Sequence, residues 1–219
     1  MIPPLPVDDR GRSIEFGRRR DARISWLLSM HPITAAMLVS LCWFPSKNKA
    51  LRRLNWLVRR KRIQLVGTVC RKAGRPENVY CRWRPSAHQL LHEVELTDLC
   101  FRLQASKILR GPHVLDRDVR PDAEVWINGI LYYLEWDRGT MSYDQVARQR
   151  FRRYEGCKHL ALWVCSTEVR QKGLRARAER VRDVALFTTA AEALTSPHRE
   201  IWVDYQGKKA TLPRQKEGG

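Results

Sequence analysis

The stretch RPDAEVWINGILYYLEWDRG, residues 120–139, constrains the fold of this chain more than any other segment. Asn128-Gly129 is a strong signal for a type I′ hairpin turn, because both central positions of that turn need a positive φ. Alternating apolar residues on either side of it predict two β-strands. Counting outward from a two-residue turn places Asp122 opposite Glu135, where paired Cβ atoms lie about 5 Å apart. The sequence therefore predicts a hairpin that brings two carboxylates together.

A third acid extends this pair, since strand alternation places Asp137 on the same face as Glu135. Facing carboxylates repel, and one of them takes a raised pKa unless something neutralises them. A hard divalent cation such as Mg²⁺ or Mn²⁺ would do so, because it prefers oxygen ligands. Ordinary ion pairs with arginine are the alternative. The arginines that the sequence offers nearby are Arg120, Arg138, Arg148 and Arg152.

The chain is strongly basic, with 41 Lys and Arg against 23 Asp and Glu, a formal charge of +18 over 219 residues. Such an excess attracts polyanions, so nucleic acid is the expected partner, although charge alone does not separate DNA from RNA. An anionic membrane surface is the alternative, but no lipidation motif or long basic amphipathic helix supports it. No apolar run reaches the roughly 18 residues of a membrane span. The Pro-rich, then charged first residues lack a signal-peptide core, which predicts a cytoplasmic protein.

The N-terminal part reads as a flexible basic arm, residues 1–22, followed by a compact unit, residues 23–84. Its periodicity predicts three helices and two short strands, at residues 22–32, 33–43, 47–62, 63–69 and 78–83. Three helices followed by a two-stranded wing are the order of a winged helix-turn-helix, whose third helix enters the major groove. A three-helix bundle used for protein contacts, including dimerisation, is the alternative.

The predicted third helix is apolar on one side and cationic on the other, with Ala50, Leu54 and Leu57 at helical spacing. The loop between the two predicted strands is also basic. We therefore expect a DNA-binding surface on this helix and on the tip of the wing. The expected DNA-binding residues are Lys47, Lys49, Arg52, Arg53, Arg59, Arg60, Lys61, Arg71, Lys72 and Arg75.

Residues 86–205 predict a second unit, and residues 206–219 a disordered tail. A long amphipathic helix at 86–109 precedes the hairpin. Helices and strands then alternate: helices at 142–156, 166–183 and 190–196, and strands at 159–165, 184–189 and 199–205. The strand at 159–165 is apolar throughout, which is typical of a strand buried on both faces. This order predicts an α/β (α+β) fold with a mixed sheet flanked by helices.

Pro121-Asp122 before a hairpin, followed by Glu135-x-Asp137 on its second strand, resembles the motif of the PD-(D/E)xK nucleases. The resemblance implies a restriction-endonuclease-like fold in which Asp122 and Glu135 are the motif acids. Glu95 or Asp98 on the preceding helix would match the acid of the family's first helix. Asp137 stands where the family carries its catalytic Lys, which puts hydrolysis in doubt. Arg148 on the next helix would supply a positive charge, but arginine is a poor proton acceptor.

Several motifs resemble the replication-relaxation family of plasmid and mobile-element proteins more closely. They are LLHEVELTDLCFRL, RPDAEV with YYLEWDRGT, and LALWVCSTEVRQKGLR, together with the predicted winged helix. This resemblance implies a DNA-binding protein of a mobile genetic element that acts in replication, relaxation or mobilisation. Double-stranded DNA is then the expected partner, with a homodimer and replication or mobilisation proteins as further ones, and no membrane.

Two functions follow from the resemblance. In the first, the chain is a metal-dependent nuclease or nickase: Asp122 and Glu135 bind Mg²⁺ or Mn²⁺, Asp137 or Glu95 completes the metal shell, and the metal activates water. In the second, it is a non-enzymatic transcriptional regulator or replication accessory protein with an inactive nuclease fold. Fold resemblance does not decide between them.

Overall fold

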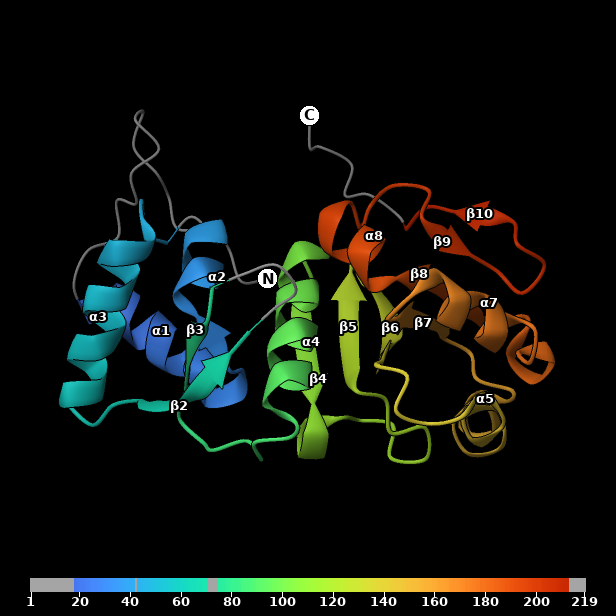
Figure 1. Ribbon diagram of the computed structural model, residues 1–219, viewed down its shortest axis with the longest axis horizontal. Coiled ribbons are helices and arrows are strands. Elements are labelled where there is room, and N and C mark those ends of the chain that lie inside the picture. The colour runs from blue at the N-terminus through green and yellow to red at the C-terminus, as the bar shows by residue number, and fades with distance from the viewer. Residues whose placement is uncertain (1–17, 42, 71–74, 213–219) are drawn as a thin grey trace. The chain divides into compact units, whose positions relative to one another are not determined.

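The computed structural model describes residues 18–41, 43–70 and 75–212, which form two compact units that meet in sequence at Phe101 and Arg102 (Figure 1). The first unit contains four helices and three strands among its described residues. They are α1 (Arg18–Met30), β1 (Ile33–Thr34), α2 (Ala35–Ser40), α3 (Lys47–Arg59), β2 (Gln64–Val69), β3 (Glu77–Cys81) and α4 (Leu90–Arg102). The strands form an antiparallel sheet in the order β1-β3-β2.

Local sequence signals set the helices of this unit. Thr34 caps α2, its side chain accepting a hydrogen bond from the backbone N–H of Met37, and Ser46 caps α3 in the same way. The apolar face of α3 is buried through Leu54 and Leu57, as its periodicity predicts. The three helices and two strands expected here are therefore present, and β1 is an additional strand.

The second unit is an α/β structure built on a mixed sheet, as predicted. Its strands are β4 (Lys107–Arg110), β5 (Ala123–Ile127), β6 (Ile130–Asp137), β7 (Leu160–Cys165), β8 (Ala185–Thr189), β9 (Trp202–Val203) and β10 (Lys209–Ala210), in the sheet order β10-β9-β8-β7-β6-β5-β4. Strands β6, β7 and β8 are parallel, and the remaining neighbours are antiparallel. Its helical segments are η1 (Gly111–His113), α5 (Tyr143–Gln145), η2 (Val146–Phe151), α6 (Arg152–Tyr154), α7 (Glu168–Arg175), η3 (Glu179–Val181) and α8 (Ala190–Thr195).

The hairpin of β5 and β6 has the predicted register. Asn128 and Gly129 form its turn with φ values of 52° and 81°, and the pairing runs without a bulge out to Ala123 and Leu134. The next pair outward is Asp122 and Glu135. The turn residues thus fix the position of the acids, as expected.

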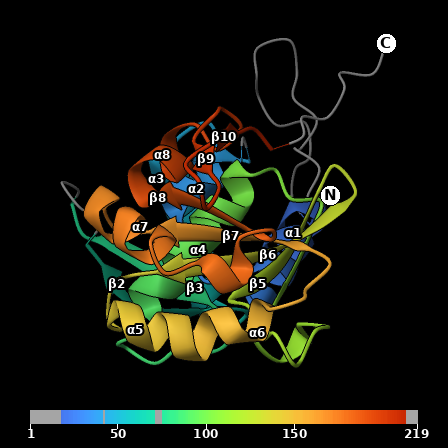
Figure 2. The same cartoon turned by 90° about the vertical axis from the view of Figure 1, so that its right-hand side faces the viewer.

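Aromatic side chains build the core on one face of this sheet. Trp163 on β7 and Phe187 on β8 stack at 6.3 Å between ring centroids, and Phe151 packs edge-on against Trp163 at 4.9 Å. Tyr154 and Leu174 complete the cluster. The segment from α5 to α6 therefore covers this face, and Figure 2 shows it running alongside the strands.

Sheet pairing overrides several expectations. The helix expected at 86–109 ends at Arg102, Gln104 has a φ of 52°, and residues 107–110 pair with β5 as a strand. Pairing with β9 likewise gives the expected tail a strand, β10. Residues 18–22 of the expected arm belong to α1, and residues 1–17 lie outside the described part. Helix α4 groups with the first unit up to Phe101, whereas the sequence placed it with the second.

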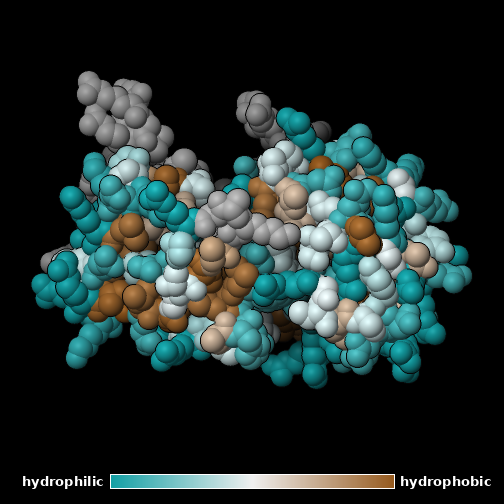
Figure 3. All heavy atoms as spheres, viewed as in Figure 1, coloured by the Kyte–Doolittle hydropathy of each residue, from teal (hydrophilic) through white to brown (hydrophobic). Residues whose placement is uncertain are grey.

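On the face seen in Figure 3 both units are mainly polar, with the larger hydrophobic patches on the first unit. The large exposed hydrophobic side chains of the first unit include Trp26, Leu65 and Trp83. Within the described residues, no helix combines the length and apolar character needed to cross a membrane.

Candidate functional site

The three predicted acids gather at one end of the β5–β6 hairpin. Glu135 and Asp137 lie on β6 and are 3% and 5% exposed, and Asp122 directly precedes β5. The carboxylate of Asp122 accepts a hydrogen bond of 2.8 Å from the backbone N–H of Trp136, which ties it to β6. The cluster is therefore built into the sheet rather than left as a solvated strand end.

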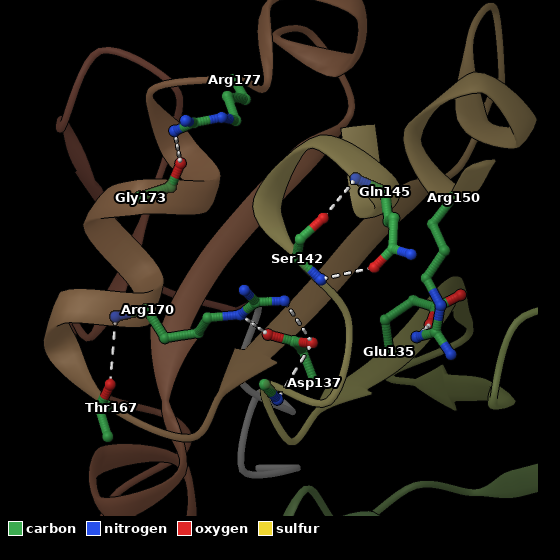
Figure 4. Close-up of polar contacts among 10 residues, drawn as sticks. Glu135, Asp137, Ser142, Gln145, Arg150, Thr167, Arg170, Gly173 and Arg177 are labelled. Carbon is green, nitrogen blue, oxygen red and sulfur yellow. Dashed lines mark hydrogen bonds and ion pairs between the residues drawn. The ribbon is translucent and has the colours of Figure 1, made fainter. Parts of the chain in front are cut away.

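Glu135 has two partners on the helix that covers its face. Arg150 Nη1 lies 2.6 Å from Oε2, and the hydroxyl of Tyr154 donates to Oε1 at 2.5 Å. Arg150 belongs to η2, a π-helical turn, which is a feature often seen at functional sites. Figure 4 shows Arg150 beside Glu135, and Tyr154 on α6, four residues after Arg150, donates to the same carboxyl.

Burial raises the pKa of Glu135 to about 8, and the negative charge of Asp122 acts in the same direction. The charge of Arg150 and the hydroxyl of Tyr154 oppose this without cancelling it. Burial acts to lower the pKa of Arg150, but the charges of Glu135, Asp122 and Asp137 raise it on balance. Arg150 is thus the cation that all three acids of the cluster act on.

Asp137 is held by a different arginine. Arg170 on α7 binds both of its oxygens, with Nε 2.5 Å from Oδ2 and Nη2 3.1 Å from Oδ1 (Figure 4). The ring of Tyr143 stacks beneath the guanidinium of Arg170 at 4.6 Å and beneath that of Arg177 at 5.0 Å. Two planar hydrogen bonds and a flat aromatic support fix the fork of Arg170 in one orientation.

The sequence analysis predicted other arginines as ion-pair partners of the acids. Arg148 is exposed and donates Nε to the backbone oxygen of Asp144 at 3.3 Å. Arg120 donates to the backbone oxygen of Arg117, while Arg138 and Arg152 are exposed. Arg150 and Arg170 pair with the acids instead, and neither was predicted from the sequence.

The position of Arg170 follows from a strand pairing and a helix cap. The parallel pairing of β6 with β7 aligns Asp137 with Cys165, and Thr167 caps α7 two residues later. Arg170 in the first turn of that helix then returns toward Asp137. Finding it requires knowing that β6 and β7 are neighbours, which the hairpin alone does not give.

The first-helix acids lie elsewhere in the chain. Glu95 is half-buried and Asp98 is 3% exposed, and both lie on the part of α4 that belongs to the first unit. The cluster described above is made by residues of the second unit.

These carboxylates fit a divalent cation poorly in this arrangement. Each oxygen of Glu135 and Asp137 already accepts a hydrogen bond from an arginine or a tyrosine, and Asp122 accepts one from the backbone. Across the described ranges, no three His, Cys, Asp or Glu side chains form a group that would hold a metal ion. The oxygens that would bind a metal are instead bound by Arg150, Tyr154 and Arg170.

The predicted DNA-binding residues divide into two groups. Lys47 pairs with Glu77 at 2.7 Å, and Arg53 forms a fork with the buried Asp21. The others within the described ranges are exposed: Lys49, Arg52, Arg59, Arg60, Lys61 and Arg75. Arg71 and Lys72 lie outside the described residues.

Neither a scan against models of known protein families nor a comparison with curated proteins gave a match for this chain.

Proposed function

We propose that this chain is a DNA-binding protein whose first unit is a winged helix and binds duplex DNA through α3. The observation that carries the proposal is the exposed stripe on α3, made by Asn48, Arg52, Asn55 and Arg59. Their spacing of four, three and four residues places them on one side of the helix. Arginine and asparagine are the side chains best suited to guanine and adenine edges in the major groove.

The engagement of Arg53 supports this reading. Arg53 pairs with the buried Asp21, while Lys47 stays half exposed in its pair with Glu77, so the free outward charge belongs to neighbours such as Arg52. The hydroxyl of Tyr80 donates to Oδ1 of Asn55 at 2.9 Å and orients that side chain. A cationic helix face with an oriented amide suits a nucleic-acid groove.

For the second unit we propose a nuclease-like scaffold that does not hydrolyse DNA. Its support is the engagement of the acids. Glu135 pairs with Arg150, and Asp137, which stands where the family carries its lysine, pairs with Arg170. The protein would then be a cytoplasmic regulator or replication accessory protein of a mobile element, in keeping with the resemblance to the replication-relaxation family.

Fluorescence anisotropy with a labelled duplex tests the proposal. We expect wild-type protein to bind at low salt, and R52A/R59A to lose affinity by roughly tenfold or more, at about 1–3 kcal/mol per lost base contact. The control R180A/R182A removes the same two charges from exposed positions of the second unit. Equal weakening of both double variants, or no binding by wild type, would refute the proposal.

A further inference from the structure

The loop between β4 and β5 borders an open cavity that no part of the proposed function uses. It has a volume of about 370 Å³ and is lined by Gly111, Val114, Asp116, Arg117, Arg120 and Pro121. This volume is within the range of small-molecule sites, ~300–1,000 Å³. Val114 and Pro121 give it an apolar wall, and the two arginines give it positive charge.

Both arginines are available to a ligand. Arg117 and Arg120 are exposed, and neither forms an ion pair within the described ranges. The one hydrogen bond of their side chains there runs from Nε of Arg120 to the backbone oxygen of Arg117. The terminal nitrogens of both guanidinium groups are therefore free to donate, and arginine binds phosphate oxygens in this way.

Asp116 also lines the cavity, and both of its carboxylate oxygens accept hydrogen bonds from the loop and from Tyr133. Its Oδ1 accepts hydrogen bonds from the backbone N–H groups of Asp118 and Val119, at 3.1 and 3.0 Å. Its Oδ2 accepts one from the hydroxyl of Tyr133 at 2.7 Å. Burial would raise the pKa of Asp116, but these hydrogen bonds lower it on balance.

The loop is held in a strained conformation. Arg120 has a φ of 51°, which is unfavourable for a residue with a side chain and more so directly before proline. The backbone N–H of Arg120 donates to the backbone oxygen of Asp116 at 3.1 Å. The backbone N–H of Asp116 in turn donates to the buried carboxylate of Glu124 at 2.7 Å. Strain that the surroundings enforce in this way is common at ligand-binding sites.

We propose that this cavity binds a phosphate group of a nucleotide or of a nucleic-acid strand, with Arg117 and Arg120 on the phosphate and the wall of Val114 and Pro121 against the sugar or base. The site is separate from the α3 surface and does not depend on the proposed function. Both sources of the ligand offer the same chemistry, a phosphate next to an apolar ring system.

Calorimetric titration with deoxyadenosine monophosphate, deoxyadenosine and inorganic phosphate tests the proposal. We expect the monophosphate to bind wild type at least tenfold more tightly than the nucleoside. R117Q/R120N should weaken it at least tenfold, since asparagine tolerates the left-handed backbone. The control R180Q/R182Q, which loses the same charge, should bind like wild type. Should the double variant not fold, R117Q serves alone, because the Arg117 side chain makes no hydrogen bond within the described residues.

Two oligonucleotides distinguish the sources of the phosphate. A single strand with a 5′-phosphate that binds more tightly than the same strand without one identifies a terminal monoester, and equal binding that still depends on Arg117 identifies the backbone. R52A/R59A should leave monophosphate binding unchanged, so a failure of the α3 surface is seen separately. Binding that R117Q/R120N does not reduce, or that the nucleoside matches, would overturn the proposal.

Discussion

Arg170 holds both carboxylate oxygens of Asp137, at 2.5 and 3.1 Å, although 33 residues separate them in sequence. Both side chains are buried, so the pair is protected from water and salt. Arg170 is thus bound to both oxygens that another cation would need. The pair therefore decides how the acidic end of the hairpin behaves.

Removing one partner of this pair should be more damaging than removing both. Replacing Arg170 by Met leaves a buried carboxylate without its counter-ion, and we expect a loss of about 3–5 kcal/mol in the free energy of unfolding. The double variant R170M/D137L should recover most of that loss, because no buried charge remains. Urea unfolding measures both. If the double variant were as unstable as the sum of the two single ones, the ion pair would not be the cause.

The raised pKa of Glu135 predicts a pH-dependent loss of stability. A buried acid whose pKa rises from 4.5 to about 8 binds its proton more tightly in the folded state than in the unfolded one. Its contribution thus becomes less favourable as the pH rises from about 4.5 to about 8 and is constant above that.

The variant E135Q isolates this effect, because glutamine keeps the shape without the titrating proton: its oxygen can accept from Arg150 while its amide N–H donates to the hydroxyl oxygen of Tyr154. We expect its stability relative to wild type to increase across that window, by on the order of a few kcal/mol. Thermal melts of both proteins at matched pH values measure the difference. A difference that stays flat with pH would mean that Glu135 is charged throughout.

Gly173 should be sensitive to substitution because Tyr143 lies flat against it. A Cβ at this position of α7 would overlap the Tyr143 ring. We expect G173A to destabilise the protein by about 1–3 kcal/mol, the usual range for overpacking. In a Y143A background the same change should stabilise it by roughly 0.5–1 kcal/mol, since alanine favours helix. An unchanged sign in the two backgrounds would contradict the packing described here.

Divalent cations should leave the acidic cluster unaffected, because arginines and Tyr154 already occupy its oxygens. We expect no Mn²⁺-dependent rise in melting temperature for wild type, and the same for D122A. Plasmid nicking should be absent with Mg²⁺ or Mn²⁺, both in wild type and in D122A/E135A. A Mn²⁺-dependent rise that D122A abolishes would restore the metal-dependent nuclease as the leading function.

Arg52 and Arg53 are adjacent, but replacing each by alanine should affect different properties of the protein. R53A leaves the buried Asp21 without its partner, so we expect a loss of about 2 kcal/mol in unfolding free energy. R52A should change stability by less than about 0.5 kcal/mol, as at other exposed positions, and weaken DNA binding instead. Melting and anisotropy on the same two proteins separate the roles. A stable R53A that loses DNA binding would move Arg53 to the DNA surface.

The sequence by itself determined what depends on near neighbours. Asn128 and Gly129 need a positive φ, so they set the turn, and the turn sets the register that faces Asp122 with Glu135. Helical spacing likewise predicts the buried face of α3. Such signals act over a few residues, which is why they can be read without knowing the fold.

Only the tertiary structure decided which side chains neutralise the acids. That choice depends on β7 pairing with β6, on α7 returning across the sheet edge and on the π-helical turn that carries Arg150. The chain contains many arginines with equivalent charge, and helical spacing favoured Arg148 and Arg152, four residues apart on one face of the expected helix, over Arg150 and Arg170. Position in space, set by packing around Trp163, selects among them, because a buried acid is paired with the cation that the core brings to it.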